Sequence, residues 1–238
     1  MRQPVLIPLS LFLFSGCQTS DFTDDVDKEW NVSFYSNCQL PQNAISTIEE
    51  NGNKFLRFKL ENMQKGGCSS DREPRHGAPY WERAELKQST FLDTNSIYEI
   101  KFKVRFLEGF TGKRETFFQI HQSTPGCRTG PTTMLKFSTN RLRLDAKRDP
   151  EHHTNYYSNI KLDELFNKWS RIKFKYDGKN KIINVFLNSD LIFRDITFVP
   201  LPCGRPHIKF GIYRPGSKYT PNNTSKVDFD DVEVKKIK

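Results

Sequence analysis

The chain has 238 residues, of which 36% are hydrophobic and 13% are aromatic, and its formal net charge is +9. This length and content predict one domain with a well-packed core, or at most two small ones. After the N-terminus the sequence contains no apolar run long enough to span a bilayer. A sequence pI near 9.3 indicates a polyanionic partner, for which nucleic acid, anionic lipid and acidic polysaccharide all qualify.

The N-terminus has the pattern of an export signal. The stretch "MRQPVLIPLSLFLFSGC" places one early arginine before an apolar run, and small residues precede Cys17. This order is typical of a bacterial lipoprotein, which predicts a signal peptide at 1–16, lipidation of Cys17 and a short acidic tether at 17–29. An ordinary signal peptide with an incidental cysteine is the alternative. The lipoprotein interpretation predicts an outer-membrane or cell-surface protein that contacts the membrane only through its lipid anchor.

Four further cysteines support export. An even number of cysteines in an exported chain predicts two disulfides, and three connectivities remain open. Their spacing contains no C-x-x-C pair, so it matches no zinc pattern. The four candidates are Cys38, Cys68, Cys127 and Cys203.

From residue 30 to 238 the chain shows no linker, repeat or low-complexity run, which predicts a single domain. Alternation of apolar and polar residues with period 2 is the dominant pattern, and turn signals such as "YDGKN" and "LNSD" separate the segments. One short helix is predicted at 162–169. We therefore expect an all-β fold, an antiparallel two-sheet jelly roll of the concanavalin-like sandwich type with a concave polar cleft. The clearest predicted strands are 54–60, 97–106, 141–147, 170–176, 182–187, 191–198, 207–213 and 227–234.

Three further stretches each combine an apolar face with a face of hydrogen-bonding or titratable residues. In "TFFQIHQ", Gln119 and His121 project together because residues i and i+2 share a face of a strand. Taken singly, each polar residue has a simpler explanation, such as a satisfied histidine, a packing tyrosine or a solvated arginine. The combination predicts a site. The same alternation places Arg83, Glu85 and Lys87 together in "RAELK", and His207, Lys209, Gly211 and Tyr213 together in "HIKFGIY".

The order of "RAEL", "QIH" and "KFGIY" resembles the three motif strands of alginate lyases of polysaccharide lyase family seven, written R-[ST]-E-L, Q-[IV]-H and Y-x-K-x-G-x-Y-x-Q. The motifs are also similar to those of glucuronan lyases and of the heparin-lyase-like group. Ala84, His207 and Pro215 depart from the family-seven pattern. With the long loop before "RAEL", they point toward the glucuronan or heparin-lyase-like relatives and bear on substrate choice more than on reaction type.

The resemblance implies β-elimination in a uronic-acid polymer, which leaves a 4,5-unsaturated product. Arg83 and Gln119 would neutralise the uronate carboxylate, and His121 and Tyr213 would exchange protons with C5 and O4. Where the C5 hydrogen and O4 lie on one ring face, Tyr213 could serve as both base and acid. Where they lie on opposite faces, His121 would be the base. The other residues expected to bind substrate are Lys209, Lys87, Arg143, His207 and Arg141.

Two other function classes compete with a lyase, and the sequence also gives expectations about oligomeric state, partners and cofactors. A non-catalytic carbohydrate-binding sandwich is the alternative, and a glycoside hydrolase ranks last because no E-x-D-x-x-E strand supplies its two carboxylates. We expect a monomer acting on an acidic polysaccharide. Export disfavours nucleic acid as the partner, and the scattered basic residues disfavour lipid. The chemistry requires no metal or other cofactor, although Asp228–Asp231 could hold a structural calcium or simply end a strand.

Overall fold

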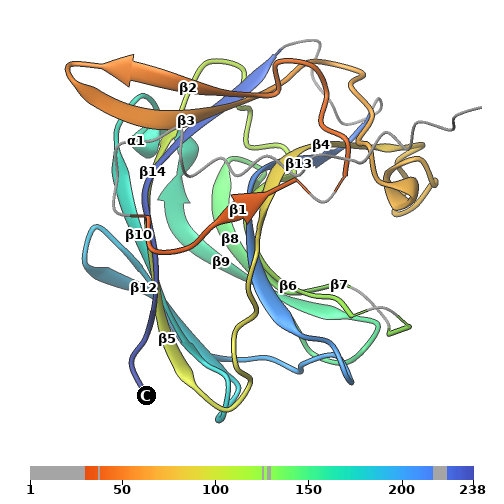
Figure 1. Cartoon of the computed structure of the whole chain (residues 1–238), viewed down its shortest axis with the longest axis vertical. Coiled ribbons are helices and arrows are strands. Elements are labelled where there is room, and N and C mark those ends of the chain that lie inside the picture. Colours follow the sequence, from red (N-terminus) through yellow and green to blue (C-terminus); the bar gives the residue numbers. More distant parts are fainter. Residues whose placement is uncertain (1–29, 37, 125, 128–129, 217–223) are drawn as a thin grey trace, which may run out of the picture.

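The computed structural model describes residues 30–36, 38–124, 126–127, 130–216 and 224–238, so the predicted signal peptide, Cys17 and the tether lie outside the described residues. The chain forms two seven-stranded sheets in which every pair of neighbouring strands is antiparallel, and the predicted all-β sandwich is confirmed. Figure 1 shows the two sheets facing each other, with β5 and β10 on one side and β4, β13 and β6 on the other.

The first sheet has the order β1-β4-β13-β6-β7-β8-β9. Its strands are β1 (Phe34–Tyr35), β4 (Trp81–Gln88), β13 (Pro206–Pro215), β6 (Glu115–Gln122), β7 (Gly130–Ser138), β8 (Arg141–Lys147) and β9 (His153–Lys161). The second sheet has the order β12-β11-β10-β5-β14-β3-β2. Its strands are β12 (Asp190–Thr197), β11 (Ile182–Leu187), β10 (Ser170–Asp177), β5 (Ile97–Phe106), β14 (Ser225–Lys236), β3 (Asn53–Leu60) and β2 (Ile45–Glu50).

The alternating segments fold as predicted because each strand buries one apolar face between the sheets. Along β5, every second residue from Tyr98 to Phe106 is buried and the charged residues between them are half-buried. Phenylalanines join the two layers: the ring of Phe118 lies 4.9 Å from that of Phe102 and 4.6 Å from that of Phe174. Such ring pairs add to the stability that apolar burial supplies.

The predicted helix at 162–169 is wrong beyond its first turn. Helix α1 covers only Leu162–Leu165 and buries its two leucines, and Phe166 is already extended. Asn167 then adopts a left-handed φ of 56°, a conformation that asparagine tolerates better than most residues, so the chain does not return to the helix. The described residues otherwise contain a short 3-10 helix, η2 (Ser69–Asp71), before β4.

Two disulfides are present, as predicted, and the structure decides their connectivity. Cys38 pairs with Cys68 and thereby ties the segment after β1 to the loop that carries η2. Cys127 pairs with Cys203 and joins the loop after β6 to the loop before β13. Both bonds therefore fasten loops of the first sheet. Within the described ranges, no helix is long and apolar enough to cross a membrane.

Candidate active site

The three motif strands are far apart in sequence but adjacent in the first sheet, in the order β4-β13-β6. Tyr213 lies opposite Arg83 in the ladder between β13 and β4. On the other side of β13, His207 pairs with His121. Lys209 lies between two predicted site residues, because it pairs with Lys87 on β4 and with Gln119 on β6.

Gly211 departs from the predicted alternation. The ladder between β13 and β6 shifts register between Phe210 and Tyr213, at a β-bulge. A Cβ on Gly211 would lie 2.8 Å from the ring of Phe58 in the core and 2.1 Å from the carbonyl oxygen of Ala84. The prediction that Gly211 shares the polar face is therefore wrong. Its φ of +134° and this close approach to backbone both require glycine.

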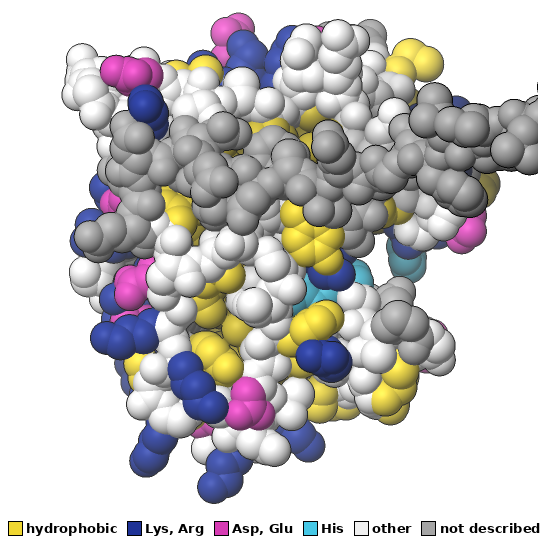
Figure 2. Space-filling model, viewed as in Figure 1, with side chains coloured by type: hydrophobic (Ala, Val, Ile, Leu, Met, Phe, Trp, Pro, Cys, Tyr) yellow, Lys and Arg dark blue, Asp and Glu magenta, His cyan; other side chains and the backbone are white. Residues whose placement is uncertain are grey.

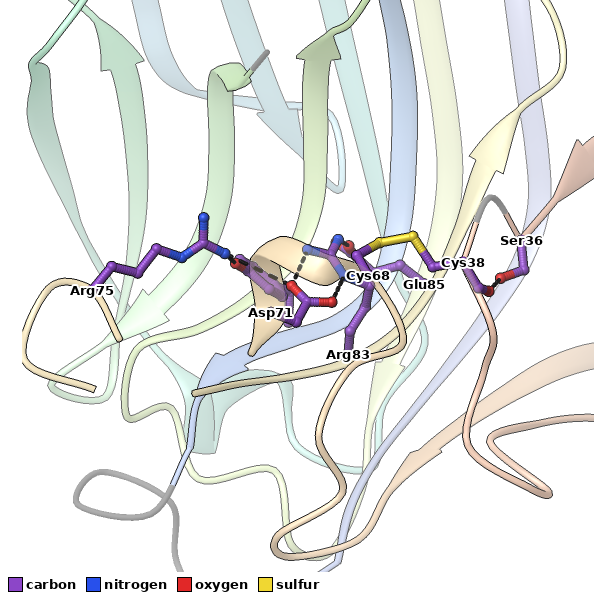
Figure 3. Close-up of a disulfide and its surroundings, with 8 residues drawn as sticks. Ser36, Cys38, Cys68, Asp71, Arg75, Arg83 and Glu85 are labelled. Carbon is purple, nitrogen blue, oxygen red and sulfur yellow. Dashed lines mark hydrogen bonds and ion pairs between the residues drawn. A yellow bond between two sulfur atoms is a disulfide. The ribbon is translucent and has the colours of Figure 1, made fainter. Parts of the chain in front are cut away.

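Arg83 lies at the centre of a buried network of charges. Its Nε and Nη2 donate to the two carboxylate oxygens of Asp71 at 2.8 and 2.7 Å, and its Nη1 donates to Glu85. Gln119 donates from Nε2 to the other oxygen of Glu85 at 2.5 Å. Figure 3 shows Asp71 reaching Arg83 from the loop beside the Cys38–Cys68 disulfide. The charge of Arg83 is thus already balanced by two carboxylates. The sequence placed Glu85 on the same strand face as Arg83, but it did not indicate Asp71.

The neighbours of Arg83 and Tyr213 along their strands form a second network on the opposite face. Arg214 donates from Nε to Glu82 at 2.6 Å and from Nη1 to Glu115 at 3.0 Å, and all three side chains are buried. Of the two glutamates near Arg83 on β4, Glu85 therefore pairs with Arg83, and Glu82 pairs with Arg214. The Arg214 bonds fasten β13 to β4 and β6 directly beside Tyr213 and hold it in place relative to Arg83.

The loop between β3 and β4 contributes two residues that sequence reasoning missed, Asp71 and Arg75. Gly66 lets the loop pack closely, since a Cβ there would lie 2.2 Å from Asp71 Oδ2. The loop then turns sharply between Arg75 and Ala78, which exchange two backbone hydrogen bonds of 3.0 Å. The glycine pair before Cys68 could have indicated a tightly packed loop. Nothing in the sequence showed that it would fold over Arg83.

Tyr213 is enclosed by cations and an aromatic ring. Arg75 donates from Nη2 to the Tyr213 hydroxyl, and the guanidinium of Arg83 lies 4.2 Å from the centre of the phenol ring. The ring of Trp81 stacks on that of Tyr213, with the ring centres 4.8 Å apart and an interplanar angle of 22°. Burial raises the pKa of Tyr213 well above its ordinary value, although Arg83 and Arg75 oppose that shift. The hydroxyl is therefore protonated at neutral pH and available as a donor.

His121 and His207 form a pair of neutral imidazoles with ring centres 5.4 Å apart. Burial, with Lys209 nearby, holds the pKa of His121 well below its ordinary value and lowers that of His207 to about 3. Neither His121 Nδ1 nor His207 Nε2 has a hydrogen-bond partner among the described residues, although both atoms are buried. Such unsatisfied atoms are rare in folded proteins and are common where a ligand binds.

Lys209 is a buried cation, only 6% exposed, that makes no direct ion pair with any described residue. The carboxylates of Glu85 and Asp71 nevertheless lie near enough to act on its charge. Burial, and secondarily the charge of Arg83, lowers the pKa of Lys209 to about 8. Lys87 is half-buried beside it, with its ammonium 5.8 Å from the ring of Tyr35. Figure 2 shows histidine side chains set back in a hollow that lysine and arginine side chains border.

The two arginines predicted on β8 are placed differently from each other. Arg143 is half-buried, binds Asp145 through Nε at 2.5 Å and Tyr157 through Nη1 at 3.0 Å, and lies two strands from β6. Arg141 begins β8, is exposed and donates to Asn159 at 3.2 Å. The structure therefore leaves Arg141 outside the group formed by β4, β13 and β6, and places Arg143 on an extension of the same sheet.

Asp228–Asp231, considered for calcium, lies within β14. The Asp228 carboxylate accepts hydrogen bonds from Arg57 at 2.7 and 3.0 Å and from Arg105 at 3.0 and 2.8 Å. Guanidinium groups therefore already occupy these oxygens. Among the described residues, no group of three or more histidine, cysteine, aspartate or glutamate side chains is placed to hold a metal ion.

Comparisons with known proteins agree with this architecture. A family model described as polysaccharide lyase matches residues 24–233. The family 7 alginate lyase A1-II′ is 15% identical, with 82% of this chain and 84% of that chain covered and a TM-score of 0.61. An alginate lyase from Corynebacterium sp. is 18% identical, with 84% and 83% covered and a TM-score of 0.57. An alginate lyase from Pseudomonas aeruginosa is 11% identical, with 91% and 90% covered and a TM-score of 0.56.

These structural similarities confirm the predicted jelly-roll fold. At such low sequence identities, similarity to a solved structure is evidence for the fold alone. A search of curated proteins found no match. The family match rests on most of the chain and includes all three motif strands.

Proposed function

This chain belongs to the polysaccharide lyase family, and from that premise we propose that it cleaves a uronic-acid-containing polysaccharide by β-elimination. The observation that carries the proposal is Lys209, a buried ammonium that makes no direct ion pair with any described residue, near a neutral His121 whose Nδ1 has no hydrogen-bond partner among them. A buried unpaired charge is costly in the free protein. A uronate carboxylate bound there would supply the missing negative charge.

Binding of the carboxylate is the first task in the proposed mechanism. The C5 proton is weakly acidic while the neighbouring carboxylate is fully ionised, so catalysis requires donors that withdraw its charge. Lys209 carries the unmatched positive charge, and Lys87 adds a second cation on the adjacent strand. Arg83 contributes less charge than the sequence suggested, because Asp71 and Glu85 bind it. Its role in the proposal is to hold Glu85, and through Glu85 the Gln119 amide, in position.

Proton transfer is the second task. In the proposed step, for uronate residues whose C5 hydrogen and O4 lie on opposite ring faces, the C5–H bond breaks and its proton passes to the His121 imidazole, while its electron pair forms the C4=C5 double bond. The C4–O4 bond breaks, and Tyr213 donates its phenolic proton to the departing O4. The products are a 4,5-unsaturated uronate and a new reducing end. Proton exchange through water between the imidazolium and the tyrosinate then restores both residues. On uronate residues that carry the C5 hydrogen and O4 on one ring face, Tyr213 would serve as both base and acid.

The low pKa of His121 is consistent with the base role. A neutral imidazole is ready to accept a proton at neutral pH. Its basicity is weak in the free protein because burial and Lys209 disfavour the imidazolium. A bound carboxylate would offset the charge of Lys209 and raise that basicity at the moment of reaction. Tyr213 is protonated at neutral pH, as tyrosine ordinarily is, and can therefore take the acid role. Burial raises the pKa of Tyr213 and so makes its proton harder to donate, and the charges of Arg83 and Arg75 oppose that effect.

The proposed substrates are polyuronates of the alginate or glucuronan kind, since the solved neighbours are alginate lyases and the departures at Ala84 and His207 point toward the glucuronan relatives. The test incubates the protein with a panel of alginate, glucuronan, ulvan and glycosaminoglycans. We expect ultraviolet absorbance of the unsaturated product to rise together with reducing ends on at least one polyuronate. Reducing ends without the chromophore would indicate hydrolysis and would refute β-elimination.

We further propose that the protein acts at the cell surface as a lipoprotein, with a polysaccharide as its partner and no cofactor. The two disulfides support an oxidising compartment. In a bacterial host, Cys17→Ser should abolish labelling by radioactive palmitate and release the protein from the membrane fraction. Labelling that persists in this variant would contradict lipidation at Cys17.

A further inference from the structure

The disulfide-fastened loop between β3 and β4 brings a cation to the phenolic oxygen of Tyr213. We propose that Arg75 is a positioning residue that makes Tyr213 an effective acid, an inference that rests on the proposed β-elimination. Arg75 belongs to none of the three motifs, and it reaches the site only because its loop folds over β4 and β13 (Figure 3).

The hydrogen bond itself sets the direction of the phenolic proton. A guanidinium can only donate, so in the bond from Arg75 Nη2 the Tyr213 oxygen must be the acceptor. The single O–H of Tyr213 therefore points elsewhere, which leaves it free for a leaving oxygen. When that proton departs, the phenolate remains against a fixed positive charge, which stabilises it.

Arg75 is held in place from three directions. The tight turn from Arg75 to Ala78 places φ of +51° at His76 and +78° at Gly77, the backbone of a two-residue hairpin turn. The Arg75 guanidinium lies 5.0 Å from the ring centre of Trp81. Its Nη2 lies 3.7 Å from Oδ1 of Asp71. Because both carboxylate oxygens of Asp71 also accept hydrogen bonds from Arg83, one carboxylate fixes the two cations that contact Tyr213.

The loop that carries Arg75 is attached to its surroundings at several points. The Cys38–Cys68 disulfide lies immediately before η2, whose last residue is Asp71. Gly67 packs against the backbone of Gln39, since a Cβ there would lie 1.9 Å from its carbonyl oxygen. Gly66 donates its backbone N–H to Trp81 at 2.9 Å. The loop is thus bound covalently at one point and by close backbone contact at two others.

The test separates acid catalysis from a structural role by changing the leaving group. The variants are Arg75→Met, Arg75→Lys and, as a matched control, Arg72→Met, which removes an exposed arginine from the same loop. Each is assayed on the polyuronate that the wild-type protein cleaves. Each is also assayed on an oligouronate that carries fluoride in place of O4 on its non-reducing terminal residue. Fluoride leaves without a proton, so elimination from this substrate needs the base but not the acid.

For Arg75→Met we expect kcat on the polymer to fall by about 100-fold, with KM within roughly threefold of wild type. Fluoride release should stay within roughly threefold of wild type, because no proton is donated in that reaction. Arg75→Lys, which keeps a positive charge, should retain more polymer activity than Arg75→Met. Arg72→Met should match wild type on both substrates.

Equal losses on both substrates would overturn the inference, since a structural defect does not depend on the leaving group. Unchanged polymer turnover in Arg75→Met would overturn it as well. Neither outcome would contradict the proposed lyase function, provided that the wild-type protein forms the unsaturated product. A wild-type protein that forms no unsaturated product from any polyuronate would overturn both proposals together.

Discussion

Replacement of Tyr213 by phenylalanine should lower kcat by about 10² to 10⁴-fold while leaving KM within roughly threefold. The change removes only the hydroxyl, which in the proposed mechanism donates the proton to O4. The ring keeps its stack on Trp81 and its contact with the Arg83 guanidinium, so the fold and the substrate-binding surface should persist. Initial rates of unsaturated product formation, with kcat and KM determined separately, provide the measurement.

A matched control uses a tyrosine outside the site. Tyr176 on β10 is buried, more deeply than Tyr213, and stacks on Phe198 at 5.3 Å, so Tyr176→Phe removes a hydroxyl from the second sheet. We expect this control to retain wild-type turnover. Full activity of folded Tyr213→Phe would contradict the acid role. A parallel loss in both variants would point to packing.

Replacement of Lys209 by methionine should change activity and stability in opposite directions. The variant keeps a flexible apolar stem of similar length and removes the ammonium. We expect kcat/KM to fall by about 100-fold, because the charged contact with the substrate carboxylate is lost. The free energy of unfolding at pH 7 should rise by about 1 to 3 kcal/mol, since a buried unpaired charge is removed.

The direction of the stability change follows from the pKa. Lys209 has a pKa of about 8 in the folded protein, below its ordinary value of 10.5. A lysine with a lowered folded-state pKa destabilises the fold wherever it is charged, and the cost is fully present below pH 8 and disappears as pH rises toward the unfolded value. The stability gain of Lys209→Met should therefore be largest at neutral pH and shrink above about pH 8. Chemical denaturation at pH 7 and at alkaline pH measures it.

The pH dependence of activity provides a second measurement on the same variant. In the wild-type protein kcat/KM should fall as pH rises through about 8, because Lys209 loses its proton in the free enzyme. In Lys209→Met this fall should be absent. Lys173→Met, which removes a half-exposed lysine from the second sheet, should keep both the wild-type profile and the wild-type kcat/KM. A Lys209→Met protein that is less stable and fully active would contradict the assignment.

The amino-acid sequence determined the strands and the composition of the polar face. Period-2 alternation reflects burial of one face of each strand, which is a local property, so strands such as β5 and β10 could be predicted within one or two residues. The same rule predicted that Gln119 and His121 share one face of their strand, and that Lys209 and Tyr213 share one face of theirs. It needs only the order of residues along the chain. It was wrong at Gly211 and along the helix after Leu165, where a bulge and a left-handed asparagine break local regularity.

Only the tertiary structure decided which charges meet. The pairing of β13 between β4 and β6 brings together residues about 90 and 120 positions apart, and strand alternation carries no information about such neighbours. The loop with Asp71 and Arg75 has no periodicity, and its course depends on the Cys38–Cys68 pair and on glycines that admit close contact. The balance of charge on Arg83, the absence of a direct ion pair on Lys209 among the described residues and the cation on Tyr213 all follow from that folding. Electrostatics depends on distance in space, which chain order does not determine.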